Sequence, residues 1–193
     1  ILRCLVGSEM CIRDSLCMLE HKRIVLTGGP SSGKTSLLNH IQHPDIHCFE
    51  EVSRGVISKA LAKGTTQPFL DNPLGFSEAL FERRLHDYFE DKKNKMHVYD
   101  RGIHDVVAYL NAIGDEVPCG MLNDCSTYCY DAVFVFPPWE AIFTQDAERM
   151  EVFEEAIHFH KALLETYTHF GMQCIEVPKS SIEERFRFIL DHL

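Results

Sequence analysis

Apolar positions in this chain fall into short continuous runs that alternate with longer segments of helical spacing. The short runs, rich in Val, Ile, Phe and Leu, predict buried strands at 24–26, 46–49, 96–100, 131–136 and 174–177. The segments between them predict helices at 33–41, 56–63, 76–92, 103–113, 120–128 and 151–170, with a last helix after a capping box at 180–184. Strands that alternate with helices predict an α/β fold with a parallel sheet covered on both faces.

The first predicted strand runs directly into a glycine-rich turn. The turn has the spacing G-x-x-x-x-G-K-[ST] from Gly28 to Thr35, which is typical of a loop that wraps phosphate in backbone N–H groups. In such a loop Lys34 reaches the β- and γ-phosphates and the Thr35 hydroxyl binds Mg²⁺. We therefore expect a nucleotide to contact Gly28, Gly29, Ser31, Ser32, Gly33, Lys34, Thr35 and Ser36.

A second motif, with an aspartate at its centre, lies at the end of the strand predicted at 96–100. Asp100 follows an apolar run and precedes Arg101. A carboxylate at this point in a phosphate-loop enzyme holds Mg²⁺ or its water beside the loop, which would place Asp100 next to Thr35. The alternative is that Asp100 only caps the end of the strand.

Two further acids follow the strand predicted at 46–49. Glu50 and Glu51 stand at the carboxyl end of this strand, where ligands of open parallel α/β sheets bind, and Arg54 follows three residues later. Either carboxylate could take a proton from an attacking hydroxyl, and Arg54 could hold an anionic group. A solvated i,i+3 ion pair at the start of a helix is the structural alternative.

A charged stretch at 143–150 lies between the fourth strand and the long helix at 151–170. Phosphotransferases often carry a mobile lid at this position, and Arg149 could swing from it onto the transferred phosphate. The alternative is an exposed arginine paired with Asp146 or Glu148.

Composition narrows the classes of function. The chain has 193 residues, 45% of them hydrophobic, with a formal net charge of −10, so we predict one globular domain that has no nucleic-acid partner. No apolar run approaches the roughly 20 residues of a membrane span, so no integral membrane segment is expected.

Eight cysteines without regular spacing predict reduced thiols in a cytoplasmic protein. Cys119, Cys125 and Cys129 are expected to be small buried side chains on a helix, since their spacing fits no common zinc pattern.

The first residues differ in character from the remainder. Residues 1–17 resemble a translated sequencing adaptor, which predicts a non-native or poorly packed extension. We expect the natural protein to begin near Met18 and residues 18–193 to form the domain.

From about Lys22 onward the chain resembles AAA-labelled phosphate-loop proteins related to the nicotinamide riboside kinase domain and to thymidylate-kinase-like nucleoside and nucleotide kinases. The matching segments are 28–35, 50–54, 99–102, 137–139 and 146–149. This resemblance implies a P-loop three-layer sandwich with five strands in the order 2-3-1-4-5, a lid, and the cofactors ATP and Mg²⁺. It does not identify the acceptor.

Two hypotheses for function follow. The first is an ATP- and Mg²⁺-dependent phosphotransferase acting on a small nucleoside- or nucleotide-like acceptor. In it Lys34, Asp100, Arg149 and Glu51 are catalytic, and Glu50, Arg54 and Arg101 bind the acceptor. The second is an ATP- or GTP-dependent switch or ATPase with a protein or lipid partner. No guanine-reading Asn-Lys-x-Asp segment is present, which favours ATP.

Overall fold

The computed structural model describes residues 22–62, 72–90, 93, 96–142 and 153–193 of the chain. The strands are β1 (Lys22–Gly28), β2 (Ile46–Phe49), β3 (Met96–Asp100), β4 (Ala132–Phe136) and β5 (Cys174–Glu176). The helices are α2 (Lys34–His40), α3 (Ser53–Ala62), α5 (Pro73–Phe89), α6 (His104–Ile113), α7 (Cys119–Thr127), α8 (Phe153–His169) and α9 (Ile182–Asp191), with a short 3₁₀ helix, η1 (Glu140–Ile142).

The five strands form one parallel sheet in the order β2-β3-β1-β4-β5. This confirms the predicted fold class and the strand order that the family resemblance implied. In the register, Leu26 of β1 lies beside Asp100 of β3, and Gly28 lies beside Phe136 of β4. The carboxyl ends of β1 and β3 therefore bring the phosphate loop and the acidic motif to the same edge.

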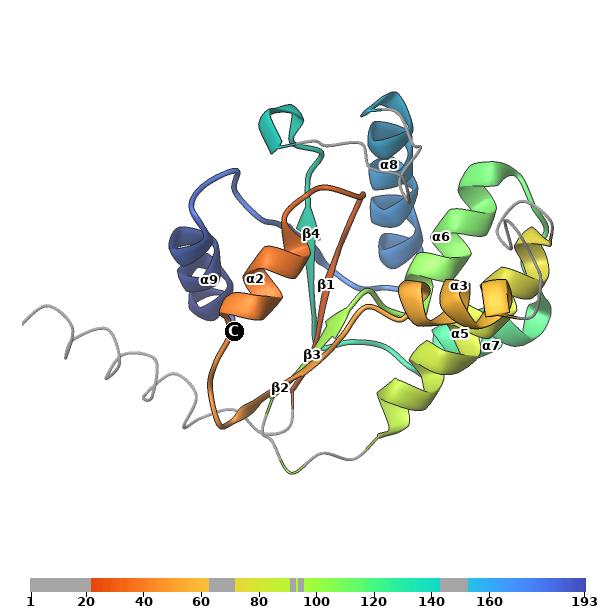
Figure 1. Ribbon diagram of the computed structural model, residues 1–193, viewed down its shortest axis with the longest axis horizontal. Coiled ribbons are helices and arrows are strands. Elements are labelled where there is room, and N and C mark those ends of the chain that lie inside the picture. Colours follow the sequence, from red (N-terminus) through yellow and green to blue (C-terminus); the bar gives the residue numbers. More distant parts are fainter. Residues whose placement is uncertain (1–21, 63–71, 91–92, 94–95, 143–152) are drawn as a thin grey trace, which may run out of the picture.

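Side chains alternate between the two faces of the sheet and build two separate cores. Ile24 and Leu26 pack with α2 and α9 on one face, whereas Val25 packs with α5, α6 and α8 on the other. Figure 1 shows α2 and α9 on one side of the sheet and the other α-helices on the opposite side. The central strand is buried on both faces, which is why its sequence is continuously apolar.

Two helices begin three residues earlier than the apolar pattern predicts. α5 starts at Pro73 and not at 76, because the Asn72 side chain accepts a hydrogen bond from the Gly75 amide and Pro73 occupies the first helical turn. α3 starts at Ser53 and not at 56, which places Arg54 in its first turn. The capping box of α9 is confirmed, since Ser181 and Glu184 exchange both of its hydrogen bonds.

The prediction for the cysteine group is correct only in part. Cys125 is fully buried on α7, but Cys119 and Cys129 are exposed. Cys119 opens the helix and Cys129 follows its end, so only the central cysteine of the three faces the core.

Residues 1–17 and the segment 143–152 lie outside the described residues, so the predictions about the extension and the lid concern parts that the structure does not describe. The assignment of 18–193 to a single domain stays a prediction. Across the described ranges, no helix combines the length and the apolar character that crossing a bilayer would need.

Candidate functional site

The turn between β1 and α2 has the backbone conformation of a phosphate cradle. Gly28 and Gly33 have φ values of 141° and 85°, and Ser31 also has a positive φ of 53°. A Cβ atom on Gly28 would lie 2.4 Å from the Phe136 carbonyl oxygen of the neighbouring strand. Glycine is therefore required at this position both for its φ and for the close approach of two strands.

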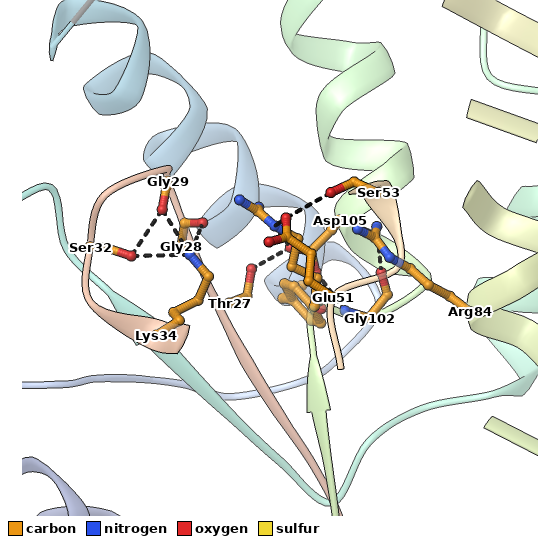
Figure 2. A network of polar contacts seen from close by, with 12 residues as sticks. Thr27, Gly28, Gly29, Ser32, Lys34, Glu51, Ser53, Arg84, Gly102 and Asp105 are labelled. Carbon is orange, nitrogen blue, oxygen red and sulfur yellow. Dashed lines mark hydrogen bonds and ion pairs between the residues drawn. The ribbon is translucent and has the colours of Figure 1, made fainter. Parts of the chain in front are cut away.

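Lys34 folds back into this turn. Its Nζ donates to the carbonyl oxygens of Gly28 at 2.9 Å and Gly29 at 2.8 Å, and to Ser32 Oγ at 3.1 Å (Figure 2). Burial, together with the nearby Arg101 charge, lowers the pKa of Lys34 to about 7. A buried ammonium group held by neutral oxygens is short of negative charge, and a bound phosphate would supply it.

Thr35 and Asp100 offer the oxygen donors expected for Mg²⁺. Asp100 is buried at the end of β3, and its Oδ1 is without a hydrogen-bond partner in the structure. Burial raises the pKa of this carboxyl group against the opposing effect of Lys34 and Arg101. Thr35 is exposed at the start of α2, a helix that packs against β1 and β3. A hard cation prefers such carboxylate and hydroxyl oxygens, so the residues fit the metal. An orphaned carboxylate oxygen does not support the alternative of a simple strand cap.

Glu51 and Arg101 face each other across the carboxyl ends of β2 and β3. Arg101 Nε lies 3.9 Å from Glu51 Oε1, which also accepts a hydrogen bond from Ser53 Oγ at 2.8 Å. Burial opposes the ionisation of Glu51, but Arg101, the Ser53 hydroxyl and more distant cations outweigh it and lower the pKa. Glu51 is thus a half-buried carboxylate that faces Arg101 across the site.

Beside this pair is a small cleft that is open to solvent. Its lining residues come from the ends of β2 and β3, the start of α3 and the inner face of α5, and they are Phe49, Glu50, Val52, Arg84, Asp87, Tyr99, Asp100 and Arg101. Phe49 and Tyr99 are stacked with their ring centroids 4.7 Å apart. The cleft is therefore lined by two stacked aromatic rings and by several charged groups close to Asp100, the carboxylate predicted to bind the metal.

Sequence reasoning missed a buried aspartate under this site. Asp105 in the first turn of α6 accepts hydrogen bonds from Thr27 Oγ1 at 2.5 Å, Tyr167 Oη at 2.6 Å and the Gly102 amide at 2.9 Å. Arg101 is also close, with its Nη1 3.5 Å from Asp105 Oδ1. The sequence did offer a signal for Asp105, since a charged residue next to the inward-facing Val106 and Val107 of the predicted helix 103–113 is expected to need a partner.

Arg84 of α5 was also missed. Its side chain is buried, and Nη1 donates to the Gly102 carbonyl oxygen at 3.2 Å, while Nε has no hydrogen-bond partner in the structure (Figure 2). Burial lowers the pKa of Arg84, and the Asp105 charge opposes this effect. Arg84 is four residues after Leu80 and four before Tyr88, so the helical spacing already placed it on the buried face of α5. Only the folded structure shows which groups it contacts there.

The third feature that sequence reasoning missed is a pair of residues beside the phosphate loop, Trp139 and Arg185. The guanidinium of Arg185, on α9, lies 5.5 Å from the centre of the Trp139 ring. The same guanidinium borders Gly33, where an added Cβ would lie 2.6 Å from Arg185 Nη1. The chain's only tryptophan is therefore in contact with a residue that touches the loop.

The structure brings most of the predicted residues to one edge of the sheet. The loop residues, Asp100, Arg101, Glu51 and Glu50 lie at the carboxyl ends of β1, β2 and β3. Arg54 lies in α3 at this edge, but its side chain is outside the described part of the chain, and Arg149 lies within the undescribed segment 143–152. The roles of all these residues stay predictions.

The loop between β1 and α2, in a parallel sheet of order 2-3-1-4-5, defines a P-loop NTPase fold of the kinase type. The chain belongs to the AAA domain family, whose sequence model matches residues 23–185. This agrees with the resemblance found in the sequence. No curated protein matches the chain.

Solved structures with the same fold include two kinases. A deoxyadenosine kinase from M. mycoides, solved with bound dATP, is 11% identical with a TM-score of 0.59, over 89% of this chain and 98% of its own. A thymidylate kinase from Candida albicans is 16% identical with a TM-score of 0.61, over 90% of this chain and 91% of its own. At these identities the likeness shows the shared fold.

Proposed function

We propose that the chain is an ATP- and Mg²⁺-dependent phosphotransferase that acts on a hydroxyl group of a nucleoside- or nucleotide-like acceptor. The observation that carries this proposal is the placement of the phosphate loop, with Lys34 inside it, close to the Glu51–Arg101 pair and to a cleft that Arg101 lines. A donor and an acceptor could thus meet at one edge of the sheet. The similarity in fold to two nucleoside and nucleotide kinases supports the same class.

On the donor side, the loop amides and Lys34 would bind the β- and γ-phosphates. Lys34 would exchange its neutral carbonyl partners for phosphate oxygens, which restores the charge balance that burial disturbs. Thr35 and Asp100 would hold Mg²⁺, which neutralises charge on the transferred group. Arg149 would add a further positive charge if it approaches from the lid.

On the acceptor side, Glu51 would orient the attacking hydroxyl. Its lowered pKa keeps it ionised, so it can accept a hydrogen bond from the hydroxyl and take the proton as the new P–O bond forms. The bond from the γ-phosphorus to the bridging oxygen breaks, and ADP leaves. Arg101 would hold Glu51 and the incoming group in place, with help from Glu50 and Arg54.

Phe49 and Tyr99 border the cleft and stack on each other, with 2° between their planes, and both rings are almost wholly buried. They therefore help to fix the shape of the cleft and are not proposed to stack on the acceptor. We expect the cytoplasm to be the place of action, since every cysteine within the described ranges is unpaired.

The first test is ATP consumption by the full chain with Mg²⁺ and a panel of nucleosides, nucleoside monophosphates and nicotinamide riboside. Stimulation by one compound of several-fold or more, with a phosphorylated product detected by mass spectrometry, is the expected result. Lys34→Ala should abolish it, whereas Lys161→Ala should not, because Lys161 is exposed on α8 and its ion pair among the described residues is with Glu165 on the same helix. Tight nucleotide binding with no acceptor effect across the panel would favour a nucleotide-dependent switch. Full turnover in Lys34→Ala would refute the proposed site.

A further inference from the structure

Arg101 has an unusual backbone conformation for a residue with a side chain. Its φ is +70°, in the left-handed region, which costs L-residues roughly 1–2 kcal/mol. Such a conformation persists only where the surroundings impose it. The residues that impose it here should therefore matter for the position of the Arg101 guanidinium.

The backbone on both sides of Arg101 is fixed by specific hydrogen bonds. The Arg101 amide donates to the Leu26 carbonyl oxygen of β1 at 3.0 Å, and the following amide, of Gly102, donates to Asp105 Oδ2 at 2.9 Å. The other carboxylate oxygen of Asp105 lies 3.5 Å from Arg101 Nη1. Asp105 thus contacts both the backbone of the turn at Gly102 and the guanidinium of Arg101.

Asp105 is itself fixed from two other directions. Thr27, the last residue before the phosphate loop, donates to it from β1, and Tyr167 donates from α8. Its side chain is almost wholly buried, and it has two guanidinium neighbours, Arg84 and Arg101. Figure 2 shows Asp105 between Thr27 and Gly102, with Lys34 and Glu51 nearby.

We propose that Asp105 is a positioning residue, which holds Arg101 against Glu51 and ties this acceptor-side pair to the strand that carries the phosphate loop. The role rests on the proposed phosphotransferase function, since it concerns the alignment of acceptor and donor. Asp105 itself lies beneath the site and need not touch either substrate. Small displacements of a positioning group are enough to cost a large factor in rate.

The isosteric variant Asp105→Asn separates this role from a general effect on folding. Asparagine keeps the shape and one acceptor oxygen for Thr27 or Gly102, but it removes the charge that attracts Arg101 and leaves two guanidinium groups close together. We therefore expect the guanidinium to move away from Glu51. The phosphate loop should keep its conformation, since its glycines and Lys34 make no contact with Asp105 among the hydrogen bonds seen here.

The experiment measures acceptor kinetics and donor binding for the full chain. In Asp105→Asn, kcat/KM for the acceptor should fall about 10- to 100-fold, while the ATP dissociation constant changes less than about threefold. ATP binding can be followed by the fluorescence of Trp139, which contacts the arginine beside Gly33. Asp131→Asn is the matched control, because Asp131 accepts a backbone hydrogen bond at the opposite end of the sheet.

A double-mutant cycle tests whether the effect passes through Arg101. In an Arg101→Gln background, Asp105→Asn should cost less than about twofold more in kcat/KM, because the group to be positioned is already lost. The same loss in both backgrounds, or wild-type kinetics in Asp105→Asn, would overturn the proposal. If Asp105→Asn does not fold, Tyr167→Phe removes one donor to the carboxylate, and its smaller loss should likewise vanish in the Arg101→Gln background.

A spectroscopic measurement keeps this inference separate from the proposed function. The Nε–H signal of Arg101 in the ¹H–¹⁵N spectrum should exchange slowly with water in the wild type and rapidly in Asp105→Asn. A chain that phosphorylates no acceptor but shows this change would refute the function and leave the positioning contact intact. An unchanged signal would refute the positioning role even in an active kinase.

Discussion

Replacing Gly28 by alanine should damage both the phosphate loop and the sheet. The φ of 141° lies in a region that residues with a side chain rarely adopt, at a cost of about 1–3 kcal/mol. The new Cβ would lie 2.4 Å from the Phe136 carbonyl oxygen and 3.0 Å from the Phe136 Cβ. Relief of this overlap requires β1 and β4 to separate where they pair, which adds about 1–3 kcal/mol. We therefore expect a total loss of roughly 2–6 kcal/mol in the free energy of unfolding.

The neighbouring Gly29 provides a matched comparison. A Cβ there would meet the nearest atom, Ala156 Cβ, at 3.4 Å, which is ordinary contact, and its φ lies outside the left-handed region. Gly29→Ala should change the free energy of unfolding by less than about 1 kcal/mol. Gly120→Ala, with open space around its position in α7, should raise it by about 0.5–1 kcal/mol.

Urea unfolding followed by circular dichroism measures all three variants. The reasoning requires the midpoint to fall sharply for Gly28→Ala, to stay near the wild-type value for Gly29→Ala and to rise for Gly120→Ala. A similar midpoint for Gly28→Ala and Gly29→Ala would show that the close approach of β1 and β4 does not control this position.

Three other predictions concern the metal, the pH dependence and the strained arginine. Asp100→Asn should weaken the Mg²⁺ dependence of ATP turnover, and a magnesium titration that matches the wild type would reject its metal role. Burial lowers the pKa of His104 to about 4, below its unfolded value of about 6.5. The contribution of the neutral imidazole to the free energy of unfolding is therefore fully present above about pH 6.5, and the free energy of unfolding falls by about 3 kcal/mol as the pH drops to about 4. His104→Gln should flatten this part of the stability curve in urea unfolding, and parallel curves would contradict the assignment. Arg101→Gly and Arg101→Ala should both be nearly inactive, but the glycine variant should be about 1 kcal/mol more stable, because only glycine adopts a φ of +70° without strain. Equal thermal midpoints for the two would argue against strain at this turn.

Much of the fold could be predicted from local patterns. Buried parallel strands need continuous apolar runs, so the five strands were visible along the chain, and the glycine spacing at 28–35 marked the phosphate loop. Boundaries were less accurate where a side chain decided them. α5 begins at Pro73 because Asn72 caps it, a local contact that outweighs the apolar pattern.

The candidate site likewise contains features that the sequence pattern predicts and features that only the folded structure reveals. The sequence alone identified the candidate residues Lys34, in the loop motif, and Asp100 and Glu51, at the ends of strands, and their roles stay predictions. Only the tertiary structure decided the partners of these residues. Asp105 receives hydrogen bonds from Thr27 and Tyr167, which lie 78 and 62 positions away in the chain. Such pairings depend on how the sheet and its two layers of helices bring distant segments together, and no short pattern in the sequence contains that information.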